Sequence, residues 1–208
     1  DVRKGNREGA QNSVNGRYGN KDCAAYRDMR ELLAKDNDIN AVLIATGDRW
    51  HTPASILAMQ AGKDVYCEKP GALTIAQGQA LVAATRRYGR IFQTGAQRAS
   101  EANFIVAGEL MRQGRLGKVH TVYAHLGYLP DWPRVNAVLP AEPEPPKEEL
   151  DWDLWLGASP WRPYNKHYCP TKFRWLMESG GGQIRDRGAH QFSTILWCMN
   201  ADHQISFT

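Results

Sequence analysis

Three short apolar runs, each followed by a helical pattern, constrain the fold of this chain more than any other feature. The runs are "AVLIATG" at 41–47, "DVYCEKP" at 64–70 and "IFQTGAQR" at 91–98. A continuous apolar run of this length is typical of a strand that is covered on both faces. Strands that alternate with helices predict right-handed crossovers and a parallel sheet. We therefore expect the first half of the chain to be part of a doubly wound α/β domain.

The helices around these strands are predicted from apolar spacing, capping residues and glycine stops. Thr52, followed by a proline, Thr74 and Ser100 are the expected N-caps. Thr74 also has a glutamine three residues later, which completes a capping box. The predicted helices cover residues 24–36, 52–62, 74–88 and 100–114.

The pattern changes after Gly117, where we expect a second domain to begin. Residues 118–128 alternate like an antiparallel strand, and 140–146 form a linker rich in proline and glutamate. The tryptophan-rich stretch 150–165 is predicted to pin a long loop onto a domain, with direct substrate stacking as the alternative. A glycine turn and a helix are expected over 180–200. The predicted domains are 1–117 and 118–208.

Composition and charge exclude several classes of protein. The net charge of +4 and the pI near 8.9 come from scattered basic residues, which argues against a nucleic-acid partner. No apolar run is long enough to span a bilayer, so no membrane association is predicted. The four cysteines are far apart and form no CxxC pair, which favours free thiols, a cytoplasmic location and no metal site. Because the chain does not begin with methionine, we expect it to be a fragment, so a preceding export signal is not excluded.

Two groups of residues could carry chemistry. Glu68 and Lys69 follow the second strand, at the sheet edge where parallel α/β proteins bind ligands, and Pro70 restricts the backbone there. A surface ion pair is the alternative. Asp186 and His190 are four residues apart and would share a helical face, so that the carboxylate could orient the imidazole as a general base. A buried histidine with a purely structural role is equally compatible. The glycines at 180–182 precede no Lys-Ser/Thr pair and indicate a turn, not a phosphate loop.

Together these segments resemble the Gfo/Idh/MocA family of NAD(P)-dependent oxidoreductases. The resemblance is carried by "AVLIATGDRWHTPASILAMQAGKDVYCEKP", "QTGAQR", "WDLWLG" and "GGGQIRDRGAH", in the order the family has them. It implies a partial Rossmann domain followed by an α+β domain with a mostly antiparallel open sheet. It also implies NAD as cofactor, with NADP not excluded, a sugar, cyclitol or glycoside as substrate, and a homo-oligomer for the full-length protein.

The resemblance assigns roles to individual residues. Lys69 would lie beside the nicotinamide and substrate, and His190 would be the catalytic histidine with Asp186 before it. The implied catalytic residues are Lys69, Asp186 and His190, and the implied cofactor-binding residues are Asp1, Thr46, His51, Glu68, Lys69 and Gln97. Asp1 would bind the adenosine ribose and favour NAD. Expected sugar contacts, with loop anchoring as the alternative, are Arg162, Tyr164, Asn165, Arg174 and Trp175.

The chain also departs from the family pattern. The Gly-x-Gly-x-x-Gly loop and its flanking strand are absent, so we expect this fragment alone to be inactive. Gly47 replaces a proline that is common after the threonine, and Ser193 stands where many relatives carry an aspartate.

Three alternatives remain open at this point. Lys69 could be the base in place of His190 if its pKa were lowered. The protein could be an NAD-dependent, redox-assisted glycosidase that oxidises a ring hydroxyl only transiently. It could also be a non-catalytic NAD(P) sensor on the same fold.

Overall fold

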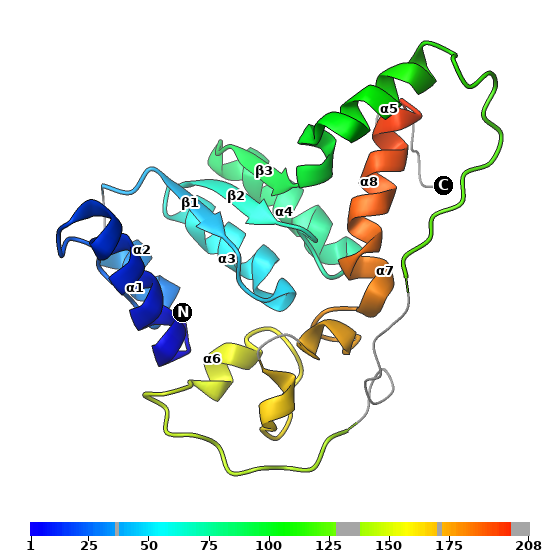
Figure 1. Cartoon of the computed structure of the whole chain (residues 1–208). Coiled ribbons are helices and arrows are strands. Elements are labelled where there is room, and N and C mark those ends of the chain that lie inside the picture. Colours follow the sequence, from blue (N-terminus) through cyan, green and yellow to red (C-terminus); the bar gives the residue numbers. More distant parts are fainter. Residues whose placement is uncertain (36–37, 128–137, 170–171, 201–208) are drawn as a thin grey trace.

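A parallel sheet of three strands lies at the centre of the molecule (Figure 1). The computed structural model describes residues 1–35, 38–127, 138–169 and 172–200. The strands are β1 (Ala41–Ile44), β2 (Asp64–Glu68) and β3 (Phe92–Gly95), in the order β1-β2-β3. All the pairings are parallel, with Cys67 of β2 between Ile44 and Thr94. The predicted parallel α/β sheet is confirmed, and the strands end together at one edge.

Two helices cover one face of this sheet. They are α3 (Asp48–Gln60) and α4 (Ile75–Tyr88), which pack on each other and place small and apolar residues against β2. Ala58, Met59 and Cys67 are almost completely buried. Each large apolar side chain buried in this way contributes roughly 1.5–3 kcal/mol relative to its exposed state. On the other face Leu43 and Ile91 are about 70% exposed, so the described residues leave that face open.

The helix boundaries correct two of the predicted caps. α3 begins at Asp48, with Gly47 as its N-cap, and Pro53 lies inside the helix. Thr52 does not cap, because its hydroxyl donates to the Gly71 carbonyl at 3.0 Å. In α4, by contrast, Thr74 accepts a hydrogen bond from the Gln77 backbone as predicted.

The last helix of the first half also begins later than predicted. Ser100 lies in a 3-10 turn, η1 (Gln97–Ser100), and the N-cap of α5 (Ala102–Arg112) is Glu101.

Two further helices precede β1 in the sequence. α1 (Lys4–Tyr18) has no buried residue, which explains why apolar spacing does not predict it. α2 (Met29–Lys35) is shorter than the predicted helix, because Asp28 accepts a hydrogen bond from the Arg30 backbone and starts the helix there.

The second half contains short helices and an aromatic block. α6 (Trp152–Leu156) and the turns η2 (Lys166–Tyr168) and η3 (Lys172–Trp175) bury Trp152, Trp155, Tyr168 and Phe173. The Trp152 and Trp155 rings are stacked with centroids 4.6 Å apart. The loop-anchoring interpretation of this stretch therefore describes what these aromatic residues do.

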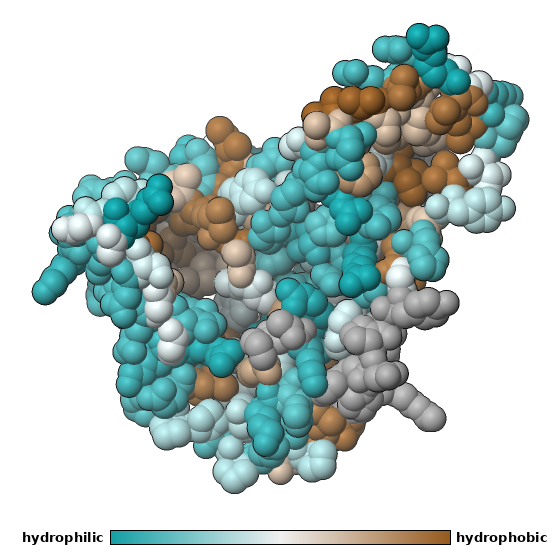
Figure 2. Space-filling model, in the orientation of Figure 1, coloured by the Kyte–Doolittle hydropathy of each residue, from teal (hydrophilic) through white to brown (hydrophobic). Residues whose placement is uncertain are grey.

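The last helices among the described residues are α7 (Gly182–Asp186) and α8 (Gly188–Cys198), after the predicted glycine turn. α8 packs against α5, and a Cβ at Gly108 would overlap the Trp197 ring, so the two helices cross closely. Figure 2 shows apolar residues gathered on the α5 end of the molecule. The proposed division into domains at Gly117 stays a prediction.

The expected antiparallel strand is not formed over 118–127. These residues have extended or irregular backbone, and Tyr123 is 92% exposed. A strand requires a hydrogen-bonded neighbour, and within the described residues no ladder includes this segment. Tyr128 lies outside them. None of the helices in the described ranges is long and apolar enough to cross a membrane, and all four cysteines carry free thiols.

Candidate active site

Lys69 and Asp186 meet at the carboxyl edge of the sheet. The Lys69 Nζ donates to Oδ1 of Asp186 and to its backbone carbonyl, both at 2.8 Å. Both side chains are more than four-fifths buried, which makes a charge-assisted hydrogen bond stronger than at the surface. Arg174 approaches the same carboxylate, with its Nε 3.6 Å from Oδ1. One carboxylate thus holds two cations from distant parts of the chain.

His190 lies within the field of this cluster. Burial lowers the pKa of its imidazole, and the positive charges of Lys69 and Arg98 lower it further, while Asp186 acts in the opposite direction. Its Nδ1 is buried and has no hydrogen-bond partner among the described residues. The expected contact in which Asp186 orients His190 is therefore not formed, because the carboxylate is directed at Lys69.

Glu68, the last residue of β2, meets Gln97, the first residue of η1 just after β3. The Gln97 amide donates to both carboxylate oxygens of Glu68, at 2.7 and 2.6 Å. The pair lies beside Lys69 in the sequence, so it belongs to the same edge of the sheet.

His51 ties together two of the loops at this edge. Its ring is 1% exposed, with Nδ1 2.7 Å from the Pro70 carbonyl and Nε2 3.1 Å from the Thr46 carbonyl. The Lys69–Pro70 peptide bond is cis. His51 therefore supports the backbone on both sides of the site, and these contacts leave its ring nitrogens engaged with protein carbonyls.

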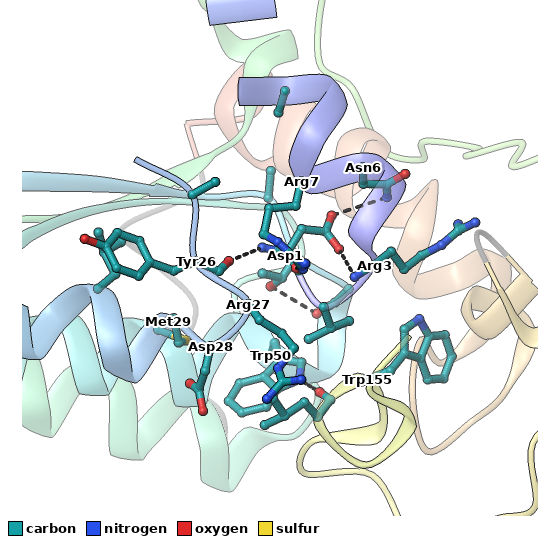
Figure 3. A pocket seen from close by; sticks show the side chains of 18 of the residues that line it. Asp1, Arg3, Asn6, Arg7, Tyr26, Arg27, Asp28, Met29, Trp50 and Trp155 are labelled. Carbon is teal, nitrogen blue, oxygen red and sulfur yellow. Dashed lines mark hydrogen bonds between the residues drawn. The ribbon is translucent and has the colours of Figure 1, made fainter. Parts of the chain in front are cut away.

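A cavity of about 590 Å³ opens between α1, α2, the loop after β1 and α6 (Figure 3). Asp1, Thr46 and Arg174 line it together. The Asp1 carboxylate accepts from the Arg3 backbone at 2.9 Å and from the Asn6 amide at 3.3 Å, which holds it at the cavity wall. Three of the predicted site residues, far apart in sequence, thus share one cavity.

The remaining expected sugar contacts are engaged with the protein itself. Arg162 forms an ion pair with Glu178, and Tyr164 packs edge-on against Trp152. Asn165 is buried, caps η2 and donates to the Pro140 carbonyl at 2.9 Å. Trp175 is half-buried in η3. Of this group, only Arg174 reaches the cavity and the Lys69–Asp186 pair.

Sequence reasoning did not single out Asp48 and Arg49, the first two residues of α3. Both are more than 90% buried, and each has a side-chain atom, Oδ2 or Nη1, without a hydrogen-bond partner among the described residues. Burial raises the pKa of the Asp48 carboxyl and lowers the pKa of the Arg49 guanidinium to about 10. The available signal was two charged residues directly after the apolar run at 41–47.

The fold and the site together define an α/β protein of the dinucleotide-binding class. Two family models match the chain: an oxidoreductase family with an NAD-binding Rossmann fold at residues 6–96, and the C-terminal alpha/beta domain of that family at 110–208. The chain belongs to the Gfo/Idh/MocA oxidoreductase family. Residues 6–96 carry its NAD-binding domain.

Relatives in this family act on cyclitols and sugars. The chain is 33% identical to the myo-inositol 2-dehydrogenase of Thermotoga maritima, over 47% of this chain and 29% of that protein. It is 32% identical to the 1,5-anhydro-D-fructose reductase of Ensifer adhaerens, over 48% of this chain and 30% of that protein. The chain thus matches less than a third of the length of either relative.

Solved structures resemble the fold over most of the chain. An NAD-binding protein from Listeria innocua has a TM-score of 0.60 at 23% identity. The match covers 94% of this chain and 43% of the Listeria protein. The aldose-aldose oxidoreductase of Caulobacter crescentus has a TM-score of 0.58 at 22% identity, covering 92% and 47%. At these identities the likeness concerns the fold.

The residues present fit part of an NAD molecule. Asp1 offers a carboxylate at the cavity wall, the type of group that bonds adenosine ribose hydroxyls. Thr46 and the Glu68–Gln97 pair lie at the strand ends, where a nicotinamide ring would be placed. The sequence contains no glycine-rich loop for the pyrophosphate, so these residues account for the two ends of the cofactor and not for its centre.

Proposed function

We propose that the whole protein transfers hydride between a secondary hydroxyl of a sugar or cyclitol and NAD. The observation that carries this proposal is the contact of Lys69 with Asp186 at 2.8 Å. It joins the Glu-Lys-Pro segment to the Asp-x-Gly-x-His segment across 117 positions. This contact supports a site in which Lys69 and His190, from opposite halves of the chain, both face the substrate.

Each residue has a chemical role in this proposal. His190 accepts the hydroxyl proton, and its lowered pKa keeps the imidazole neutral at physiological pH. Lys69 donates a hydrogen bond to the substrate oxygen and stabilises the negative charge that develops there. Asp186 positions Lys69, and Glu68 with Gln97 supports the neighbouring strand ends. Bound NAD supplies the hydride acceptor.

The cavity supports NAD over NADP. Asp1 lies at its wall, and a carboxylate there attracts ribose hydroxyls and repels a 2′-phosphate. Arg3 and Arg7 also line the cavity, so the preference is best measured directly. We expect Asp1→Ala in the whole protein to raise the KM for NAD at least several-fold and to leave the KM for NADP less affected.

The test is NADH formation by the whole protein with a panel of cyclitols, aldoses and glycosides. We expect Lys69→Met to reduce kcat/KM by about 100-fold or more, because it removes a charged donor aimed at the reacting oxygen. Lys118→Met, at an exposed position, is the control and should retain activity. Turnover that survives Lys69→Met would refute the proposal. Glycoside cleavage without NADH formation would replace it with redox-assisted hydrolysis.

The roles of Lys69 and His190 can be separated by pH. If His190 is the base, His190→Asn abolishes the acidic limb of the kcat/KM profile together with most of the rate. A near-normal rate with an unchanged profile would assign the base to Lys69 instead.

A further inference from the structure

The space beside position 47 is too small for any residue larger than glycine. Gly47 is the N-cap of α3, with φ −69° and ψ 148°, a conformation that any residue, including proline, adopts. A Cβ at this position would nevertheless overlap Nη1 of Arg49, two residues later. The backbone therefore tolerates a side chain at position 47, and the Arg49 guanidinium excludes it.

Arg49 occupies that space because it is held from the opposite side by α6. Its guanidinium lies 3.6 Å from the centroid of the Trp155 ring and 4.9 Å from that of Phe173, and its Nε donates to the Trp155 carbonyl. The indole of Trp50 donates to the neighbouring Leu154 carbonyl at 2.7 Å. Trp50 and Trp155 both lie on the α6 side of the cavity in Figure 3.

These contacts satisfy groups that a helix cannot satisfy itself. The last carbonyls of α6 (Trp152–Leu156) have no intrahelical donor, and a cation at a helix C-terminus is favoured by the helix dipole. Stacking on an aromatic ring adds a further attraction for a guanidinium. A buried arginine is costly to desolvate, so contacts of this quality are required to keep Arg49 3% exposed.

We propose that Gly47 and Arg49 are a coupled positioning pair that fixes the loop after β1 against α6 and so sets one wall of the NAD cavity. Gly47 has no Cβ, and the Arg49 guanidinium occupies the space that a Cβ at position 47 would fill. Thr46, Gly47 and Arg49 line the cavity together with Trp155, so a shift of the pair moves that wall. Neither residue is assigned to the chemical step. The cavity part of this inference rests on the proposed NAD function.

A double-mutant cycle tests the coupling, using Gly47→Ala, Arg49→Met and the double variant in the protein. We expect Gly47→Ala to lower the Tm by about 4 °C or more, because the new methyl group overlaps Nη1 and displaces the guanidinium from the Trp155 ring. In the Arg49→Met background the same change should cost little, because a flexible thioether can move away. Gly78→Ala, in α4 and with only Ala72 near its Cβ position, is the matched control and should not lower the Tm.

The second readout is the affinity for NADH, titrated by fluorescence. We expect Gly47→Ala to weaken binding at least fivefold in the parent protein and less than twofold in the Arg49→Met background. If Gly47→Ala lowered the Tm equally in both backgrounds, or did not lower it in the parent protein, the coupling between Gly47 and Arg49 would be refuted. Coupled Tm values with unchanged NADH affinity would refute the role in shaping the cavity. If the parent bound no NADH, the proposed function would fail, and the Tm cycle would still decide whether the pair exists.

Discussion

The Lys69 ammonium lies between two oxygens of one residue, the side chain and the backbone carbonyl of Asp186, each at 2.8 Å. The lysine is thereby fixed in position and direction before any ligand arrives. Because Arg174 in η3 contacts the same carboxylate, a movement of η3 would shift the Asp186 side chain and, with it, Lys69. Binding of a sugar near Arg174 and positioning of the lysine are therefore expected to be linked.

Removal of the lysine charge should change the titration of its neighbour. Lys69 lowers the pKa of His190, and Asp186 raises it. Lys69→Met removes the first effect and leaves the carboxylate without its main partner, so both changes raise the pKa of His190. The pKa is measured from the imidazole proton shifts by NMR between pH 4 and 9. Arg98→Gln should raise it less, since Arg98 ranks after Lys69 among the causes. A pKa that falls in Lys69→Met would contradict this account of the site.

The histidine also makes stability depend on pH. Its pKa in the folded state lies below the unfolded value of about 6.5, so the unfolded chain binds the proton more tightly. The free energy of unfolding should therefore decline as the pH falls through the unfolded pKa towards the lower folded one, and level off below the folded pKa. Urea unfolding at a series of pH values, compared with that of His190→Asn, isolates this contribution. Identical slopes for the two proteins would exclude it.

Asp186→Asn should be destabilising as well as inactivating. The change removes the negative charge from between Lys69 and Arg174 and leaves two cations that repel each other. Since both partners of the Lys69–Asp186 pair are mostly buried, we expect a loss of about 2–4 kcal/mol in the free energy of unfolding. Glu149→Gln is the matched control, because Glu149 pairs with Lys4 at the surface and such a pair contributes about 0–1 kcal/mol. Equal losses in the two variants would contradict the importance of the buried pair.

The glycine turn before α7 can be tested against a glycine in open space. A Cβ at Gly180 would overlap the backbone of Arg174, so Gly180→Ala must push η3 away and should cost about 1–3 kcal/mol. Gly16 lies inside α1 with nothing near its Cβ position, and Gly16→Ala should stabilise the helix by roughly 0.5–1 kcal/mol. Opposite shifts of the Tm are expected. A neutral Gly180→Ala would show that the turn has room to relax.

His51 provides a test of the support beneath the site. His51→Leu removes the hydrogen-bonding nitrogens between the Thr46 and Pro70 carbonyls and leaves these part-buried acceptors without the imidazole. We expect a loss of about 1–3 kcal/mol for such a group, together with reduced activity, because both carbonyls belong to loops of the site. His120→Leu, at an exposed position, should change neither. Circular dichroism during urea unfolding gives the comparison.

The sequence predicts the parallel sheet because β1, β2 and β3 lie in apolar runs that alternate with helical patterns. It does not predict the open face of the sheet, where Leu43 is 69% exposed and the expected cover on both faces is not formed by the described residues. α1 is not predicted, since a helix without a buried residue has no apolar face to reveal it. The N-cap of α3 is placed five residues late, at Thr52 and not at Gly47, because Thr52-Pro53 is a strong local capping signal and the true start depends on contacts with Gly71 and α6. A strand at 118–127 is expected from alternation alone, but strand formation requires a partner.

The site is only partly predictable for the same reason. Lys69 is recognisable because its position after a strand is a local property. The hydrogen-bond partner of Asp186 cannot be recognised in this way. Helical spacing favours His190, whereas in the structure the donor is Lys69, 117 positions away. Gly47 and Arg49 look unremarkable in sequence, because their relationship depends on an aromatic ring 106 residues downstream of Arg49.

The long separation between Lys69 and Asp186 has a consequence for how the protein could be divided. Each residue is held in place by its own segment, β2 on one side and α7 on the other. If the backbone were cut between residues 70 and 185, the reacting groups would belong to two polypeptides, and turnover would depend on their mutual affinity and concentration. Such a split protein would report the reassembly of its halves through the rate of the proposed hydride transfer.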